Sequence, residues 1–500
     1  MKVNAKVAMG MLLAATALAT PQMAMADGMA RHKVKHAAAP SAREQALMAR
    51  LEKLEAEMAA LRADASSARS QAADSVRTAQ IADTHATAAA QVAQSASVAA
   101  KDAGVKLAAV EKKPVPEGMR SGATTIKLGG FLKLQAAVSH FDSGTVGTNT
   151  LGRDFYLPQS SIPIGGTRNQ TSTDFSAKQT RLWLNLDTNV AGHTVKGYVE
   201  TDFQTTASAV QNVTAGGSQR TTNGYTLALR RAYVQVDKWT FGQDWTTFQN
   251  TAVLPESTDY VGSTEGTVFV RQPQIRYSTP VGKGATLHIA VENPESATAN
   301  LGAAALVENG TDRLPDLTAR LNYALPKGEV SLALLGRQVR TEVAATGAAA
   351  TTTGFGGSFA GKLFLNDKKT SDLRFMATYG QNIGRYVGLN LAPDAVYVAA
   401  NNSLADVKVF AAMAAARVAL SPTVRMNVIG SMQSVDYDGS LALASLSAYN
   451  KKAWSGAVNL FYSPAKPIDL GIEYRHGERE LVNGAKGALD RIEFAAKYSF

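Results

Sequence analysis

The sequence predicts an all-β fold, a 16-stranded antiparallel transmembrane β-barrel, with an N-terminal α-helical coiled coil. Three observations predict it: a last strand that ends in Phe500, a series of strand-like segments separated alternately by short turns and long loops, and leucines at heptad spacing near the start of the chain. The last strand alternates apolar and polar residues, which indicates one buried face. Because such a strand cannot stand alone in lipid, it implies a closed sheet upstream.

The first 26 residues have the pattern of a secretory signal peptide. A positively charged start and an apolar run precede a small-x-small cleavage site before Asp27. The alternative is an uncleaved anchor, although the apolar run is short for a membrane span. Residues 27–40 are expected to be a flexible basic tail, in which His32 and His36 are either a metal-binding pair or, as we favour, part of a solvated segment.

Residues 41–110 are predicted to form a periplasmic coiled coil. The apolar core positions follow a heptad spacing: Leu47, Leu51, Leu54, Met58, Leu61, Leu107 and Val110. Small residues, mostly alanine, continue the same spacing in between, so residues 65–105 are alternatively a free amphipathic helix or partly disordered. A coiled coil needs more than one strand, which predicts oligomerisation. Residues 111–124 contain prolines and glycines and are expected to be a linker.

The β-barrel is predicted over residues 125–500, with sixteen strands. The expected strands are 125–140, 178–189, 193–204, 226–237, 238–243, 271–279, 284–293, 315–325, 328–338, 355–365, 370–380, 407–419, 422–436, 454–463, 468–479 and 489–500. Short turns on one side and long loops on the other are typical of outer-membrane barrels, and both termini then lie on the short-turn, periplasmic side. A soluble all-β protein would share the alternation but would not need Phe500, which we interpret as an assembly signal.

Alternation within each strand assigns basic side chains to the lumen. A charge on the lipid face costs about 2–4 kcal/mol at the bilayer midplane, so the polar face of each strand is expected to point inward. The predicted pore-lining basic residues are Lys127, Lys133, Arg181, Arg231, Arg276, Arg320, Arg337, Arg374, Arg425, Arg475 and Arg491. Inward acids are fewer, and an excess of fixed guanidinium groups raises the local concentration of anions.

The segment 244–270 is the predicted constriction loop. It is expected to fold into the pore and to oppose the basic wall with Asp244, Glu256, Asp259, Tyr260 and Glu265, and it is followed directly by Arg271, which we assign to the same constriction. A wide barrel leaves a water channel, so some loop must narrow it. The alternative is that this loop only covers the outer mouth of the barrel.

Composition excludes several other functions. The net charge is +10, but the basic residues are scattered singly rather than gathered into a patch, which argues against nucleic-acid binding. The chain has no cysteine, which removes disulfides and thiolate sites. No phosphate-binding loop is present, and we expect no cofactor, no metal and no enzymatic activity. A barrel lipase or protease stays open as an alternative, because a catalytic triad is assembled in space rather than in sequence.

Several motifs resemble the DcaP-like family of trimeric bacterial outer-membrane porins. The resemblance is distinct over roughly residues 125–280 and rests on these segments: Ile126-Lys127-Leu128-Gly129-Gly130-Phe131-Leu132-Lys133, Gly197 to Phe203, Leu229 to Tyr233, Phe241-Gly242-Gln243-Asp244-Trp245, and Arg271 to Tyr277. It implies a homotrimer of sixteen-stranded barrels and uptake of anionic organic solutes such as dicarboxylates.

The leading functional hypothesis is therefore passive diffusion of small anionic solutes, of carboxylate or dicarboxylate type, through an arginine-lined pore in the outer membrane. A general-diffusion porin without anion preference is the nearest rival. A second class of function is a structural tether that links the outer membrane to peptidoglycan or to another periplasmic partner through the coiled coil.

Overall fold

The computed structural model describes residues 49–77, 80, 83, 91, 94, 118–148, 150–205, 222–308 and 310–500. The predicted signal peptide, the basic tail and most of the linker lie outside the described residues, as do Leu47, Leu107 and Val110. Residues 49–77 are a continuous α-helix, and its heptad side chains Leu51, Leu54, Met58 and Leu61 are all exposed in the single chain. Among the described residues, no helix has the length and apolarity needed to cross a membrane.

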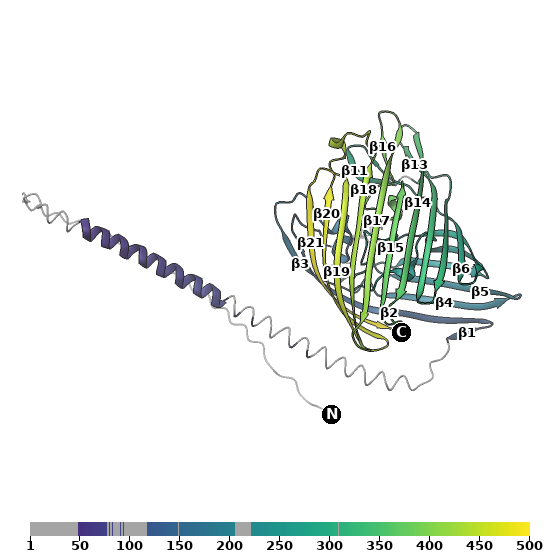
Figure 1. Cartoon of the computed structure of the whole chain (residues 1–500), viewed down its shortest axis with the longest axis horizontal. Helices are drawn as coiled ribbons and strands as arrows, with labels where there is room; N and C mark the ends of the chain where they lie inside the picture. Colours follow the sequence, from purple (N-terminus) through teal and green to yellow (C-terminus); the bar gives the residue numbers. More distant parts are fainter. Residues whose placement is uncertain are drawn as a thin grey trace, which may run out of the picture. The chain divides into compact units, whose positions relative to one another are not determined.

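The barrel consists of sixteen antiparallel strands, each paired with the next (Figure 1). They are β2 (Thr124–Phe141), β4 (Arg181–Val190), β5 (His193–Asp202), β6 (Ala228–Val236), β7 (Trp239–Trp245), β8 (Arg271–Gly282), β9 (Ala285–Glu292), β12 (Asp316–Leu325), β13 (Gly328–Val343), β14 (Ala348–Phe364), β15 (Asp372–Gln381), β17 (Ser403–Ala419), β18 (Val424–Tyr437), β19 (Asn450–Ala465), β20 (Ile468–Leu481) and β21 (Lys486–Ser499). The predicted strand number is confirmed.

Pairing between the last and first strands closes the barrel. β21 pairs with β2 from Phe131↔Ser499 to Phe141↔Leu489. Phe500 extends this ladder, because its backbone N–H donates to Gly130 O at 3.0 Å and its carbonyl accepts from Gly130 N at 3.1 Å. Closure leaves no free sheet edge, which is what a β-structure in lipid requires.

The two faces of the wall differ as the alternation predicts. On β20 and β21, Ile472 and Phe494 are exposed on the outside, whereas Arg475, Arg491 and Glu493 are buried on the inside. Inside the barrel the charged side chains are covered by inward-folded loops rather than by lipid. The core of the protein is therefore a packed, polar lumen with apolar clusters where the loops meet.

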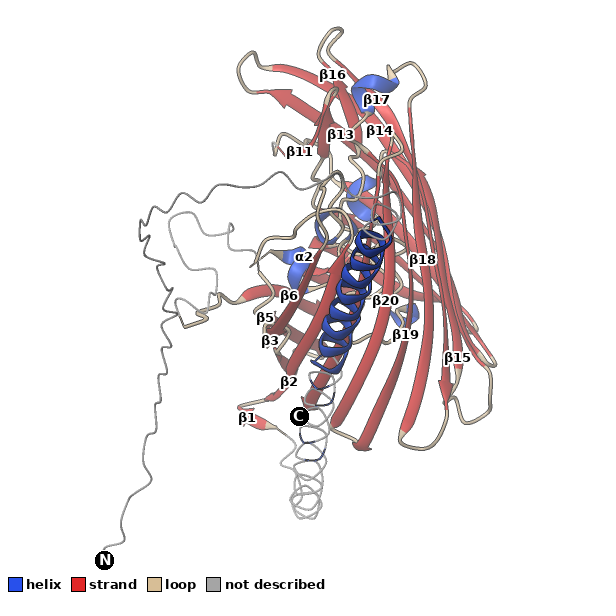
Figure 2. Cartoon of the chain, turned by 90° about the vertical axis from the view of Figure 1, so that its left-hand side faces the viewer, coloured by secondary structure: helices blue, strands red, loops and turns tan. Residues whose placement is uncertain are grey.

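Five further strands and several short helical segments lie outside the regular wall. They are β1 (Met119–Ser121), β3 (Gln170–Ser176), β10 (Ala297–Asn300), β11 (Ala303–Glu308), β16 (Ala395–Val398), α2 (Leu151–Asp154), α3 (Pro158–Ser161), η3 (Thr251–Val253), η4 (Gly384–Tyr386) and η5 (Leu443–Leu446). The strands of the wall curve round α2 and the neighbouring turns (Figure 2). These pieces lie in segments that the sequence predicted to be loops or linker, because their residues lack the long two-residue periodicity of a wall strand.

Several strand ends differ from the prediction. β13 continues to Val343, and β14 already begins at Ala348. Only a turn of residues 344–347 therefore remains between them, where the sequence predicted a loop over residues 339–354. The added part of β14, from Ala348 to Thr353, is three alanines followed by three threonines and gives no two-residue apolar signal. β1 also falls within the expected linker, where it pairs with the start of β2.

Candidate functional site

The loop 246–270 folds into the barrel and is fixed to the inner wall along its length. Near its start, Arg320 Nη1 on β12 donates to the carbonyl oxygen of Thr247 at 3.2 Å, and Asn250 Nδ2 donates to Ser331 Oγ on β13 at 3.0 Å. Further along, Arg374 on β15 donates to a carbonyl oxygen of the loop. These contacts come from side chains that the strands point inward, so the loop lies against the inner surface.

The same loop then reaches the strands at the C-terminal end of the chain. Glu256 Oε2 lies 2.8 Å from Arg425 Nε and 3.4 Å from Arg417 Nε. Arg425 is the second residue of β18, next to a short turn. The loop therefore dips to the short-turn half of the barrel, which a lid over the outer mouth alone would not do.

The predicted acids of the loop turn toward the wall or into the loop itself. Asp259 accepts the backbone N–H groups of Tyr156 at 2.8 Å and Gly262 at 2.9 Å. Glu265 is fully buried, and its burial raises the pKa of the carboxyl above its ordinary value. The prediction for Asp244 needs a correction, because this residue is the sixth of strand β7 and not part of the loop. The strand is longer than expected because Asp244 faces inward, where it pairs with Arg231 and needs no apolar environment.

Two more segments, which the sequence did not single out, fold inward and meet the constriction loop. Phe155, directly after α2, packs on Tyr260 with ring centroids 5.3 Å apart. Phe269 N–H donates to the carbonyl oxygen of Tyr386 in η4 at 3.1 Å. Gln159 Nε2 in α3 donates to Leu389 O at 2.6 Å, which joins the other two segments directly. The lumen is thus narrowed by three loops rather than one.

Most of the predicted basic residues are engaged within the protein. Those held in ion pairs are Arg181, Arg231, Arg276, Arg337, Arg374, Arg425 and Arg475. Arg320 and Arg491 donate to backbone carbonyl oxygens of the inward loops. Lys133 Nζ donates to Thr258 O at 2.5 Å, and Lys127 is exposed near the start of β2. The inner arginines therefore hold the loops in place, besides contributing charge.

One part of the wall, from β4 to β8, nevertheless has more guanidinium groups than carboxylates. Five arginines cluster there with three acids: Arg181, Arg230, Arg231, Arg271 and Arg276 with Glu200, Asp202 and Asp244. Four of the arginines share the three acids. The side chain of Arg271, at the start of β8, forms no ion pair or hydrogen bond with the residues that the structure describes. Its guanidinium stacks on Trp245, 3.7 Å from the ring centroid.

Arg230 faces inward because of a β-bulge. The pairing between β5 and β6 shifts from Glu200↔Arg231 to Thr201↔Leu229, so Arg230 is an extra residue. Its Nε donates to Asp202 Oδ1 at 2.7 Å. Strict alternation places only one of two consecutive arginines inside, and a bulge allows both to point inward. In the sequence, the adjacent arginines Arg230 and Arg231 were the only signal for this bulge.

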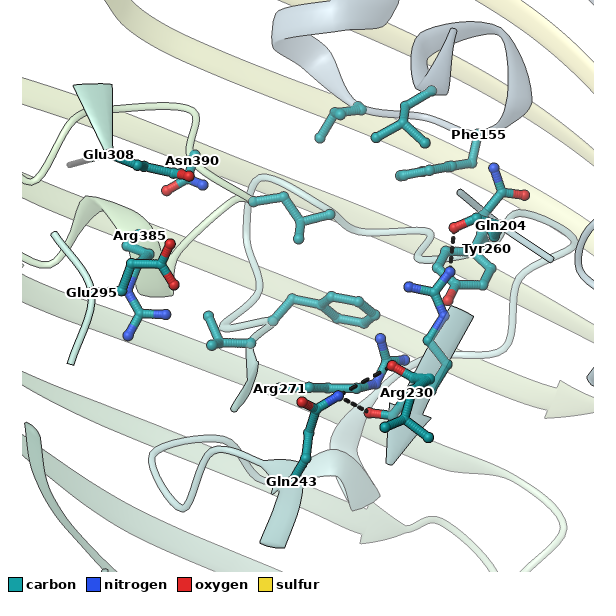
Figure 3. Close-up of a pocket in the computed structure, with 16 residues that line it drawn as sticks. Phe155, Gln204, Arg230, Gln243, Tyr260, Arg271, Glu295, Glu308, Arg385 and Asn390 are labelled. Carbon is teal, nitrogen blue, oxygen red and sulfur yellow. Dashed lines mark hydrogen bonds between the residues drawn. The ribbon is translucent and has the colours of Figure 1, made fainter. Parts of the chain in front are cut away.

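A cavity of about 460 Å³ opens between these arginines and the three inward loops (Figure 3). Its basic side contains Arg230 and Arg271, with Gln243 and Tyr260 nearby. We call it the outer cavity. Its apolar lining comes from the junction of the loops: Leu151, Phe155, Leu157, Phe269 and Leu389. An apolar cavity with a few convergent polar groups is the usual form of a site for small solutes.

A second cavity of about 190 Å³ lies on the other side of Tyr260, and we call it the inner cavity. Arg181, Lys133 and Lys497 contribute its basic groups. Tyr260 lines both cavities, and its hydroxyl donates to Asp202 Oδ2 at 2.9 Å. Tyr260 therefore forms part of the partition between two basic sites.

No metal site is formed by the described part of the chain, since no group of three or more histidine or acidic side chains there is placed to hold an ion. The predicted coiled-coil positions that the structure describes are on the helix 49–77.

Comparison with known proteins agrees with this architecture. A family model described as DcaP outer membrane protein matches residues 103–500. The crystal structure of the outer membrane channel DcaP of Acinetobacter baumannii is 24% identical, with 77% of this chain and 100% of that chain covered and a TM-score of 0.61. An anion-selective porin from Comamonas acidovorans is 12% identical, with 75% and 100% covered and a TM-score of 0.45.

No curated protein sequence matches the chain. The family match extends over well more than half of the chain and includes the whole barrel, together with the inward loops that line both cavities. The fold agrees with that of the Acinetobacter channel, and a channel or porin is not an enzyme. The chain is therefore an outer-membrane β-barrel protein that belongs to the DcaP outer membrane protein family.

Proposed function

We propose that this porin mediates passive diffusion of small organic anions, and that their carboxylate groups bind at Arg271 and Arg230 in the outer cavity. The single observation that carries the proposal is the state of Arg271, whose guanidinium lines the cavity and has no carboxylate partner among the described residues. Stacking on Trp245 holds the group in place without neutralising it. A fixed cation of this kind favours anions over cations and can bind a carboxylate through two parallel hydrogen bonds.

The inner cavity supports a second binding step for the same anion. Lys497 Nζ lies 2.8 Å from Asp469, and Arg181 is shared between Glu200 and Asp202. These groups are partly neutralised, so they would hold an anion more weakly than Arg271. A weaker site on the periplasmic side of a stronger one allows the solute to leave, as conduction requires.

The test is ion selectivity in a planar bilayer under a salt gradient. We expect the wild type to give a reversal potential in the chloride direction, Arg271→Gln to shift it toward the cation side, and Arg271→Lys to keep most of the preference. Arg313→Gln is the matched control, because it removes an exposed arginine from the loop before β12. An unchanged reversal potential in Arg271→Gln would leave a general-diffusion porin as the better description.

We also propose that the chain is a homotrimer joined by a periplasmic coiled coil. The support is the helix 49–77, which leaves its four described heptad side chains exposed in the single chain. Exposed leucines at heptad spacing are stable in water only when a partner helix covers them. If the full-length protein is a monomer in detergent, the heptad side chains of this helix are available to a different periplasmic protein or to peptidoglycan. That result would favour the tether hypothesis.

A further inference from the structure

The outer cavity has an acidic side as well as a basic one. Glu295, in the segment after β9, and Glu308, the last residue of β11, both line it. The pairing Ala297↔Glu308 between β10 and β11 brings the two carboxylates to the same end of this hairpin. Figure 3 shows them grouped with Asn390 and Arg385, away from Arg230 and Arg271.

Arg385 lies close to the two glutamates, and its charge acts to lower the pKa of Glu308. Neither side chain has a hydrogen bond or ion pair among the described residues, and the nearby Arg385 is already engaged. Arg385 Nη2 donates to Gln272 Oε1 at 2.6 Å and lies 3.4 Å from Asp316 Oδ2. Partial burial, and then the charge of Glu295, raise the pKa of Glu308. The two carboxylates therefore repel each other, and a bound cation would relieve this repulsion.

The cluster behind Arg385 is balanced and supplies no spare positive charge. Arg337 Nη1 lies 2.9 Å from Asp394 Oδ1, and Arg337 Nε lies 3.4 Å from Asp316 Oδ2. Two guanidinium groups, of Arg337 and Arg385, thus face two carboxylates in this cluster. The charges of Glu295 and Glu308 are therefore the excess on this side.

The cavity consequently has a cationic end at Arg271 and Arg230 and an anionic end at the two glutamates (Figure 3), and its lining also includes the apolar side chains of Phe269 and Leu389. We propose that the outer cavity selects solutes that carry a carboxylate at one end and an ammonium group at the other, joined by a short apolar chain, over dicarboxylates of the same length. This inference rests on the proposed carboxylate site at Arg271 and specifies which carboxylate-bearing solutes that site binds most tightly.

The physical reason is the placement of the second charge. A dicarboxylate bound to Arg271 would bring its other carboxylate toward Glu295 and Glu308, and like charges that face each other repel. An ammonium group in the same place gains two counter-ions. One ammonium group of a diamine is attracted by the glutamates, but its other ammonium group is repelled by Arg271 and Arg230. A diamine should therefore also bind more weakly than the zwitterion.

The experiment is block of the ion current of the full-length porin by three length-matched probes: glutarate, δ-aminovalerate and cadaverine. In the wild type we expect δ-aminovalerate to bind about tenfold more tightly than glutarate. The double variant Glu295→Gln/Glu308→Gln should remove or reverse this preference, because glutarate should then bind more tightly and δ-aminovalerate more weakly. The matched control is Asp367→Asn, which removes a carboxylate that is 93% exposed in a short turn.

The outcomes separate this inference from the proposed function. Equal or tighter binding of glutarate by the wild type overturns the zwitterion preference, and so does an unchanged ratio in the double variant. Arg271→Gln should weaken both carboxylate probes together. If it weakens neither, the carboxylate site itself is wrong, whatever the glutamates do. Wild-type single-channel conductance in Asp367→Asn confirms that loss of one acid does not by itself alter the barrel.

Discussion

Replacing Ser257 by alanine is expected to loosen the loop 246–270 from the barrel wall. Ser257 Oγ donates to the Glu473 carboxylate at 2.7 Å, and the next backbone N–H, of Thr258, donates to the same carboxylate at 3.2 Å. Glu473 is itself buried and paired with Arg475 at 2.7 Å. The carboxylate is thus a rigid acceptor on β20 to which the tip of the loop is attached.

The size of the effect follows from the kind of hydrogen bond. A bond to a charged partner contributes about 1.5–3 kcal/mol. The Thr258 bond remains in the variant and Ser257 is partly exposed, so the lower end, about 1.5 kcal/mol, is appropriate. Since 1.4 kcal/mol corresponds to a factor of ten, the detached loop should be populated about tenfold more often. Glu473 stays paired with Arg475, so the barrel itself should remain intact.

The assay is single-channel recording of the purified porin, with the open-channel noise and the time spent at higher conductance as readouts. Ser263→Ala is the matched control, because Ser263 Oγ is buried and bonds only within the loop, to Thr267 Oγ1 at 3.1 Å. We expect Ser257→Ala to show more frequent high-conductance events and Ser263→Ala to resemble the wild type. Identical traces for the two variants would refute the role of the Glu473 anchor.

Three further predictions concern other parts of the chain. Tyr260→Ala should join the outer and inner cavities, which raises single-channel conductance and lowers anion selectivity; unchanged conductance would show that Tyr260 is no partition. Burial raises the pKa of Glu265 above 4.5, so the folded protein retains a proton that the unfolded chain releases, and stability should fall as the pH rises through and above that value. Glu265→Gln should flatten this dependence in thermal unfolding between pH 4 and pH 8, a window set about the ordinary carboxyl value. Leu54→Asp with Leu61→Asp should reduce the trimer fraction in detergent, measured by light scattering, while far-UV circular dichroism of the barrel is unchanged.

The wall of the barrel was predictable because its signal is local. Each strand repeats every two residues, and the short turns contain residues that tolerate positive φ: Gly192 and Asp237, for example, have φ of 86° and 50° in tight turns. Lipid imposes one apolar face on every strand, so the alternation is visible without knowing any neighbour. Where a strand lacks that alternation, as β14 does from Ala348 to Thr353, the predicted strand ended too early.

The candidate site was only partly predictable, because its properties depend on partners far apart in the sequence. Alternation correctly pointed Arg425 and Arg475 inward, but it could not tell that Glu256 and Glu473 neutralise them. Arg230 was missed because a bulge breaks the two-residue period.

What the sequence by itself determined is therefore the closed sixteen-stranded wall, its inner and outer faces, and the heptad seam of the N-terminal helix. Only the tertiary structure decided which charges have no ion pair within the described part of the chain: Arg271 on one side of the outer cavity, and Glu295 and Glu308 on the other. The reason is that burial pattern is a property of one strand and its solvent, whereas net local charge is set by side chains that folding brings together across the lumen.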